Sequence, residues 1–446
     1  MAFDVRFILI SLLGIILLNV FSEFTGLEVL SIGFSLYTFL IFVHNVGRTI
    51  AIRELMTFVA ALQVVLAPSL ELADAPNSMA VSSTDYLSYA LPAVVAFSVG
   101  LNWPLIKTKS HIDLLASVKD YVKGKEKTSF ILLILGIIGS FFFNYAPVQI
   151  KALVYLFAVC LYASVMYAHY SGSKFKYVTL AIALGLLLYI TVRDGMFGHM
   201  ILWVTLYVLV VLVGTKKGTS LIVKLTLIGS CALFVLLAQS VKMEYRIKTW
   251  GDSPENRKGD LNLMVNLFVQ RINDPDFLFG KNHLYATYHR LNQGGLIAQT
   301  MAYVPHYEPF ANGELLAHFI YPFIPRIIWS GKPITGGAAN ITRFTPLVPD
   351  GITSSNISPF GEGYVNFGRI GGVIFLFFFG MLFNYCFLNV IKIAESRPSL
   401  LLWIPCLFTG CLSLETDVLS TWGSFVTMSM FLVVFWFVTK RMKLQL

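Results

Sequence analysis

Twelve long apolar runs constrain the fold of this chain more than any other feature. They lie at about 7–21, 27–45, 50–70, 86–106, 129–146, 151–169, 176–192, 197–214, 219–240, 371–391, 399–413 and 420–439. A helix needs roughly 20 apolar residues to cross the hydrocarbon core of a bilayer. Only 13% of the 446 residues are charged, whereas soluble domains average about 25%. The sequence therefore predicts an all-α polytopic membrane protein with about 12 transmembrane helices.

The basic residues indicate the topology, because Lys and Arg collect in the short cytoplasmic loops of membrane proteins. With alternate connections on opposite sides, nineteen Lys and Arg residues fall on one side, and only Lys151 and Arg193 lie in the short connections of the other. We therefore expect both termini to be cytoplasmic. The net charge of +9 then reflects topology, and we expect no nucleic-acid partner.

This topology divides the chain into three parts. Residues 1–241 hold transmembrane helices 1–9, residues 242–369 form a large outward loop, and residues 370–446 hold helices 10–12. Hydrophobic spacing predicts an amphipathic helix over 261–272 and a second helix over about 284–303. The apolar stretch 311–329 carries Glu314, His318 and Arg326, so we expect an interfacial or re-entrant segment there instead of a span.

Several chemistries lack the residues that they need. All five cysteines lie in the apolar runs, and the sequence contains no GxSxG, P-loop or HExxH pattern. His283, His289 and His306 lie close in sequence, but without the spacing of metal ligands. We therefore expect no metal and no cofactor. His289 or His306 stays a candidate general base, and the alternative for each is an ordinary surface or core histidine.

Cations in and near the outward loop are candidates for binding a lipid diphosphate. Arginine makes planar, bidentate contacts with phosphate oxygens, and apolar segments of the loop press it onto the membrane. The alternative is a solvated loop in which these cations pair with the loop's own acids. The candidates are Arg193, Arg290, Arg326, Lys332 and Arg343.

Two stretches carry a resemblance to a known family. The first is IPRIIWSGKP at 324–333, and the second is GEGYVNFGRIGG at 361–372, directly before an apolar run. The chain here resembles the Wzy-type polymerases of O-antigen and other oligosaccharide repeat units. The resemblance covers best the region from about 285 to 390, and more loosely the surrounding spans.

The resemblance implies a multi-span glycosyltransferase of the GT-C-like kind in the bacterial inner membrane, with its large loop in the periplasm. Such an enzyme transfers a growing glycan from undecaprenyl diphosphate onto the next lipid-linked unit. Its implied partners are that lipid-linked oligosaccharide, membrane lipid and a chain-length-determining co-polymerase. Cations at the site would stabilise the departing diphosphate without a metal.

The same resemblance selects the site residues of the second stretch. Glu362, between two glycines, is the first candidate for the base that deprotonates the acceptor hydroxyl. The alternative for Glu362 is an ion pair with Arg369 or Arg343. Sugar contacts by stacking and hydrogen bonding are expected from three further residues: Trp329, Tyr364 and Asn366.

Three other functions stay open at this point. An O-antigen ligase, which transfers finished glycan to lipid A core, has a similar architecture. A flippase or exporter of lipid-linked oligosaccharide would need cations inside the bundle, and the apolar runs hold few. A non-catalytic scaffold of a polysaccharide assembly complex would tolerate loss of every arginine and of Glu362.

Overall fold

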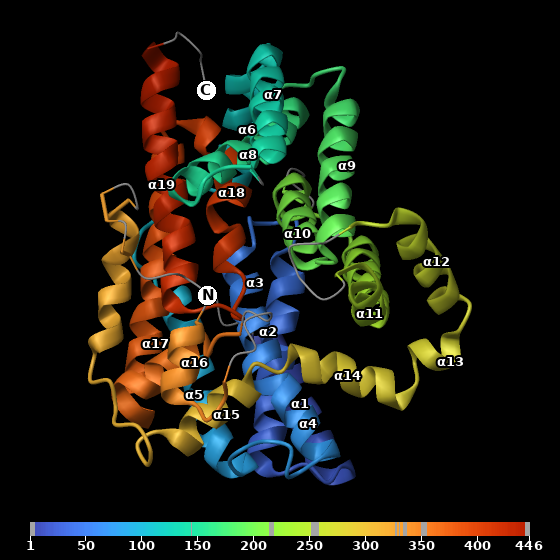
Figure 1. Ribbon diagram of the computed structural model, residues 1–446, viewed down its shortest axis with the longest axis vertical. Coiled ribbons are helices and arrows are strands. Elements are labelled where there is room, and N and C mark those ends of the chain that lie inside the picture. Colours follow the sequence, from blue (N-terminus) through green and yellow to red (C-terminus); the bar gives the residue numbers. More distant parts are fainter. Residues whose placement is uncertain are drawn as a thin grey trace.

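The computed structural model describes residues 5–143, 145–213, 218–250, 258–325, 328–329, 331–332, 337–348 and 355–441. Across these ranges the chain is helical, and the one β-bridge, between Val46 and Thr49, is isolated. Helices α6 to α8 and the C-terminal end of α19 lie at one end of the bundle, whereas α1, α4 and α15 lie at the other (Figure 1). This confirms the all-α prediction for the described residues.

The first half of the chain forms eleven α-helices and one π-helical turn. They are α1 (Val5–Phe21), α2 (Gly26–Asn45), α3 (Ile52–Ala61), the π-helical η1 (Leu62–Leu66), α4 (Ala67–Asp74), α5 (Ser83–Leu101), α6 (His111–Val122), α7 (Glu126–Phe142), α8 (Val148–Tyr170), α9 (Lys176–Asp194), α10 (Gly198–Leu212) and α11 (Leu221–Trp250). Helices α3, η1 and α4 form one continuous apolar rod over Ile52–Asp74. Helix α11 extends past the apolar run at 219–240 and carries polar residues beyond it.

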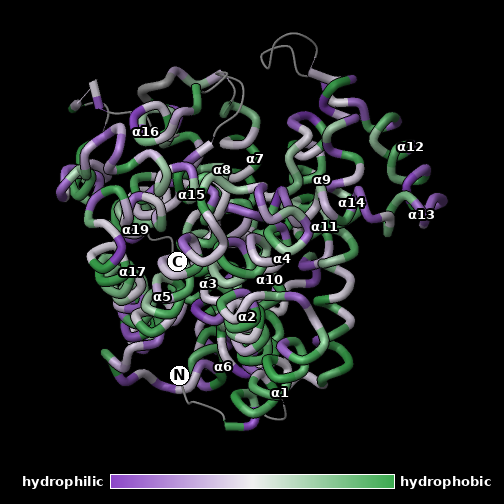
Figure 2. The backbone as a smooth tube through the Cα atoms, turned by 90° about the horizontal axis from the view of Figure 1, so that it is seen from below, coloured by the Kyte–Doolittle hydropathy of each residue, from purple (hydrophilic) through white to green (hydrophobic). Residues whose placement is uncertain are grey.

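The second half alternates short and long elements. They are α12 (Leu261–Ile272), α13 (Pro275–Leu278), α14 (Lys281–Leu291), α15 (Gly294–Tyr303), the 3-10 turns η3 (Glu314–Phe319) and η4 (Tyr321–Phe323), α16 (Ala338–Phe344), α17 (Ser358–Ala394), η5 (Pro398–Trp403), α18 (Ile404–Phe408), η6 (Thr409–Cys411) and α19 (Val418–Arg441). Figure 2 shows α12, α13 and α14 to one side of the bundle, with many hydrophilic stretches, whereas α1 is largely hydrophobic.

Within the described residues, eight helices are long and apolar enough to cross a membrane, as expected of an integral membrane protein. They are Gly26–Asn45, Ile52–Asp74, Ser83–Leu101, Ile150–Tyr170, Lys176–Asp194, Leu221–Trp250, Ser358–Ala394 and Val418–Arg441. Three further apolar segments are shorter: Val5–Phe21, Gly198–Leu212 and Pro398–Cys411. The expected run at 399–413 is broken into two 3-10 turns and a five-residue helix. Helix α7 has 17 residues, so it is shorter than each of the eight long helices.

The large core centres on α5 and α17, whose backbones approach closely through glycine. A Cβ on Gly380 would lie 2.3 Å from the Phe97 carbonyl oxygen, and one on Gly100 would lie 2.1 Å from that of Phe377. Small residues permit such approaches between membrane helices. A second, smaller core joins α9, α10, α11 and α12, where Tyr245 donates to the Val192 carbonyl at 2.6 Å.

The outward segment confirms one predicted helix and corrects another. Helix α12 has the predicted bounds, with Asp260 as its N-cap. The single helix expected over 284–303 is wrong, because the chain leaves the helix at Asn292, where α14 ends, and starts α15 at Gly294. The Asn292 side chain donates to Glu71 at 2.8 Å and accepts from the Gly295 N–H at 3.1 Å. These side-chain hydrogen bonds stabilise the break between α14 and α15. Residues 311–323 form short turns and no span.

Helix α17 begins at Ser358, well before the apolar run at 371–391, so the glycine-rich stretch 361–372 is helical. Gly368 interrupts it with φ 67° and ψ −164°, a conformation that L side chains rarely adopt. The part before this kink is buried: Tyr89 donates its hydroxyl to the Phe360 carbonyl at 2.6 Å. The expected boundary at 369/370 therefore lies at a kink inside one helix.

Candidate active site

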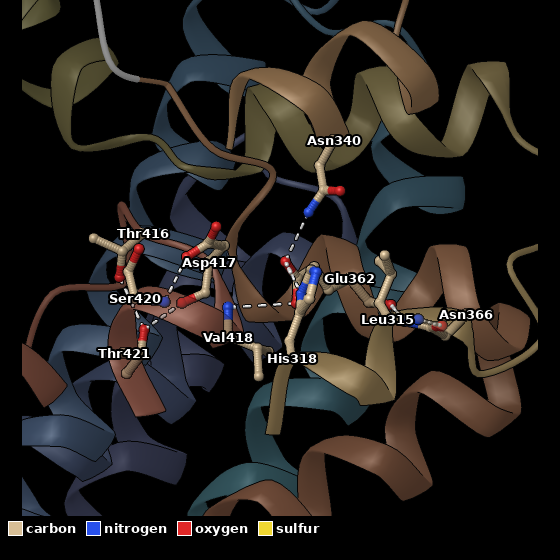
Figure 3. Close-up of polar contacts among 10 residues, drawn as sticks. All are labelled: Leu315, His318, Asn340, Glu362, Asn366, Thr416, Asp417, Val418, Ser420 and Thr421. Atoms are coloured by element: carbon tan, nitrogen blue, oxygen red, sulfur yellow. Dashed lines mark hydrogen bonds and ion pairs between the residues drawn. The ribbon is translucent and has the colours of Figure 1, made fainter. Parts of the chain in front are cut away.

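Glu362 is the centre of a buried polar cluster in the first part of α17. Its side chain is 1% exposed. Oε1 accepts from Asn340 Nδ2 of α16 at 3.0 Å, and Oε2 accepts from the backbone N–H of Val418 at 3.3 Å (Figure 3). Burying a carboxylate is costly unless it is paired. Neither Arg343 nor Arg369 supplies the pairing, because Arg369 binds Asp85, and Arg343 binds two other acids.

His318 supplies the nearest cationic group. Its Nδ1 lies 3.9 Å from Glu362 Oε1, and its side chain is 14% exposed. Burial on its own would lower the pKa of this imidazole, but Glu362, Asp417 and Glu314 together raise it above its ordinary value. His318 is therefore a histidine with a raised pKa next to a deeply buried carboxylate. Of the two side chains, His318 is the one closer to solvent.

Asn366 fixes the turn that carries His318. Its Oδ1 accepts from the Leu315 N–H at 3.3 Å, and its Nδ2 donates to the Glu362 carbonyl at 2.8 Å. At the other end of this turn, the Trp422 indole N–H donates to the Phe319 carbonyl at 3.0 Å. These bonds hold η3 against both α17 and α19. Asn366, expected to contact sugar, is 2% exposed and ties the site together from within.

Asp417 adds a second buried acid at the start of α19. Its Oδ1 accepts from the Ser420 N–H at 2.7 Å, as an N-cap does, and the residue is 3% exposed. Asp417 also acts electrostatically on both Glu362 and His318. Two acids and one histidine thus share one small volume (Figure 3).

A second polar cluster joins α4 to α14. His289 Nδ1 lies 2.9 Å from Glu71 Oε1, the Asn292 side chain donates to Glu71 Oε2 at 2.8 Å, and the Tyr288 hydroxyl donates to Asp74. Glu71 is buried, whereas the His289 side chain is 61% exposed. His289, one of the two alternative bases, is thus an exposed histidine paired with a buried acid.

Arg290 pairs with Glu415 beside this cluster, and two further cations lie near Arg290. Arg290 Nη2 lies 3.5 Å from Glu415 Oε2, and the charges of Arg290, Arg246 and Glu415 all act on Lys242. Lys242 and Arg246 lie on the polar extension of α11. The Gln63 side chain donates to Glu415 Oε1 at 3.4 Å. Arg246 also donates to the Gly195 carbonyl at 3.0 Å. Lys242, Arg246 and Arg290 thus form a group of basic side chains of the kind that attracts an anion.

The segment 415–418 connects the two parts of the site. Glu415 pairs with Arg290, and the Val418 N–H donates to Glu362. Three residues of chain span at most about 11 Å, so the Cα atoms of Glu415 and Val418 lie within that distance.

The other predicted diphosphate ligands are engaged elsewhere or lie outside the described residues. Arg193 forms a two-bond pair with adjacent Asp194, at 2.7 and 3.0 Å. Arg343 bridges Glu308 and Glu314 at 2.7 and 2.8 Å, and these acids raise its pKa further. Lys332 donates to the Ile324 carbonyl at 3.0 Å. Arg326 is not among the described residues.

The remaining predicted residues lie around the site in different environments. Tyr364 is 5% exposed, donates to the Val304 carbonyl at 3.3 Å and packs edge-on against the Tyr89 ring. Trp329 is half-buried against Tyr321. His306, the other alternative base, is exposed on the chain between α15 and η3.

Sequence reasoning missed five residues of this arrangement: His318, Asn340, Asp417, Lys242 and Arg246. His318 did carry a signal, because it lies in an apolar stretch with charges that a span does not tolerate. Lys242 and Arg246 carried no such signal, because their position depends on α11 continuing beyond its apolar part. Among the described residues no group of three His, Cys, Asp or Glu side chains has the arrangement of a metal site.

Comparison with known proteins gives one match. A family model described as "Domain of unknown function (DUF8712)" matches residues 89–395, from within α5 to the end of α17, and includes most of the site. No curated protein and no solved structure matches the chain.

Proposed function

We propose that this chain, which belongs to the DUF8712 family, is an integral-membrane glycosyltransferase that polymerises lipid-linked oligosaccharide repeat units. It would transfer the growing glycan from undecaprenyl diphosphate onto the next lipid-linked unit at the periplasmic face of the bacterial inner membrane. The resemblance of 324–333 and 361–372 to Wzy-type polymerases supports this proposal. The observation that carries it is the pairing of His318 with buried Glu362, next to a group of cations.

Glu362 and His318 suit general base catalysis in which each side chain has a different role. Glu362 is 1% exposed and already accepts two hydrogen bonds, so we assign it to positioning His318 and stabilising the imidazolium. His318 is more exposed, and we assign it the contact with the acceptor. Its Nε2, the ring nitrogen away from Glu362, would take the hydroxyl proton as the oxygen attacks the anomeric carbon. The proposal thus moves the base from Glu362 to His318.

The leaving group requires positive charge and no proton. As the new glycosidic bond forms, the bond from the anomeric carbon to the diphosphate oxygen breaks, and the diphosphate departs with the electron pair. Lys242, Arg246 and Arg290 are the cations that we assign to it, because Arg246 and Arg290 both act electrostatically on Lys242. Preorganised charge of this kind stabilises the transition state in place of a metal.

The proposed enzyme has a GT-C-like architecture of twelve spans. Four shorter helical segments would cross the membrane with the eight long helices: α1, α7, α10 and Pro398–Cys411. Both termini would then be cytoplasmic, with α12 to α16 on the periplasmic side, where both lipid-linked substrates present their sugars. A chain-length-determining co-polymerase is the proposed protein partner.

The length distribution of surface glycan in a deletion strain tests this function. We expect the deletion to leave glycan of one repeat unit, and wild type to restore the ladder. His318→Gln at the same membrane level should not restore it, because general base catalysis contributes about 10²- to 10⁴-fold. His306→Gln, at an exposed histidine outside the cluster, is the matched control and should restore it.

Two outcomes contradict the proposal. Long chains that accumulate on the carrier in the deletion strain would identify a ligase instead. A full ladder from His318→Gln would remove His318 as the base.

A further inference from the structure

A cavity of about 470 Å³ opens between the start of α1, the end of α2 and the start of α11. It shares no described lining residue with the candidate active site. On the proposed topology it faces the cytoplasmic side, where α1 begins and α2 ends. Thr219, which lines the cavity, lies close to Gly47, where φ is 75° and a Cβ would have no room.

Four basic side chains line this cavity: Arg6, His44, Arg48 and Lys224. None of its described lining residues is acidic. Lys224 is 5% exposed, and its Nζ donates to the carbonyls of Val43 and His44 at 2.8 and 3.0 Å. An ammonium group has three donors, so a third proton is available beyond those two bonds.

Arg48 brings a guanidinium to the mouth of the same cavity. Its Nη1 lies 2.5 Å from His44 Nε2, and the residue is exposed. Arginine stays protonated and carries five donors, so most of them remain for another acceptor. The charge of Arg48 also acts on Lys224, and repulsion between like charges is stronger where the dielectric is low, as at the edge of a bilayer. An anion bound between these cations would remove that cost.

The walls of the cavity favour an anion that carries hydrocarbon. Ile10 of α1 is 48% exposed and Leu221 of α11 is 61% exposed, and both line it. Leu13 and Ile16 continue the exposed apolar face along α1. Basic pockets between membrane helices on the cytoplasmic side are typical binding places for anionic lipid headgroups.

We propose that this cavity binds the phosphate of an anionic phospholipid whose acyl chains lie along α1 and α11. Arg48 and Arg6 contact the phosphate at the mouth, and Lys224 contacts it from below. A zwitterionic lipid, whose choline repels the cations, binds less tightly. This site is independent of the glycan chemistry.

Native mass spectrometry of the full chain tests the site, with dioleoyl phosphatidylglycerol and dioleoyl phosphatidylcholine as the titrated lipids. Wild type should bind phosphatidylglycerol more tightly. A cation near the membrane surface contributes about fivefold in affinity, so Arg48→Gln and Arg6→Gln should each weaken phosphatidylglycerol binding by about fivefold. Lys123→Gln, which removes an exposed charge between α6 and α7, is the control and should bind as wild type does.

Thermal unfolding in phosphatidylcholine checks that each variant is folded. If Arg48→Gln does not fold, Arg6→Gln, at an exposed helix start, tests the site alone. Equal affinity of wild type for the two lipids would overturn the proposal, as would an equal loss in Lys123→Gln. Soluble glycerol phosphate should not displace the lipid, and displacement at millimolar concentration would identify a site for soluble phosphates instead.

Discussion

At the scale of single residues, the candidate site depends on how two side chains divide exposure and charge. Glu362 is buried and hydrogen-bonded from α16 and from the start of α19. His318 lies beside it with a raised pKa and partial exposure. A buried acid near a more exposed histidine stabilises the imidazolium by its charge. The proposed chemistry rests on this pair.

Glu362→Gln should change the pH dependence of the reaction as well as its rate. Burial lowers the pKa of His318, and the nearby acids raise it. Without the Glu362 carboxylate only Asp417 and Glu314 raise this pKa, so it falls. The base acts in its neutral form, which then persists to lower pH. We expect the acidic limb of the kcat profile to move to lower pH and the plateau to fall by roughly 10²-fold.

A pH series of initial rates on the purified protein measures both effects. Glu244→Gln, an isosteric change at an acid that pairs with Lys248 and Arg271, is the control and should leave the midpoint unchanged. An unmoved midpoint in Glu362→Gln would show that this carboxylate does not set the charge of His318.

At the scale of elements, α17 combines a site-bearing segment and a membrane segment in one helix. The change of direction between them falls at Gly368, whose φ of 67° and ψ of −164° suit glycine alone. The added Cβ itself would meet only the Phe310 ring, at 3.5 Å. Glycine is therefore required at this position by the backbone conformation and not by a lack of space for a side chain.

Gly368→Ala should lower the free energy of unfolding by about 1–3 kcal/mol through this backbone strain. Gly295→Ala, in α15, places a methyl group in open space within a helix and should leave stability unchanged or slightly raised. Denaturant titration in detergent measures both. Equal stability of the two variants would mean that the kink is not imposed by Gly368.

The contact between α5 and α17 gives a second test at this scale. A methyl group on Gly380 would lie 2.3 Å from the Phe97 carbonyl oxygen, so the helices must move apart. Overpacking of this kind costs about 1–3 kcal/mol, and Gly380→Ala should lower the thermal unfolding temperature. Gly229→Ala, in α11 with nothing within 4 Å, should not, and a similar loss there would mean that the glycine contact is unimportant.

At the scale of the whole molecule, the candidate site lies where parts distant in sequence meet. Elements α16, α17, η3 and the start of α19 supply the Glu362 cluster, and α4, α11 and α14 supply the second cluster and the cations. The loop 415–418 touches both groups. The long apolar helices thus serve as the frame that brings these short polar segments together.

Hydrophobic patterning was sufficient to predict the helical class, most helix positions and the amphipathic helix α12, because these depend on local spacing. It was not sufficient for the glycine-rich stretch 361–372, which is helical because other helices bury it. Patterning also does not show that Arg193, predicted as a diphosphate ligand, pairs with its neighbour Asp194. The pairing of His318 with Glu362 joins segments 44 residues apart, and no local pattern encodes it.

The most direct test of the central claim is glycan transfer by the purified chain in lipid nanodiscs. The substrate is undecaprenyl-diphosphate-linked repeat unit, and the products are separated by length. We predict a ladder of lipid-linked products that forms without added metal in wild type and in His306→Gln, but is absent in His318→Gln. A wild-type protein that is folded, supplied with the native repeat unit and its co-polymerase, and yet forms no second repeat would contradict the account.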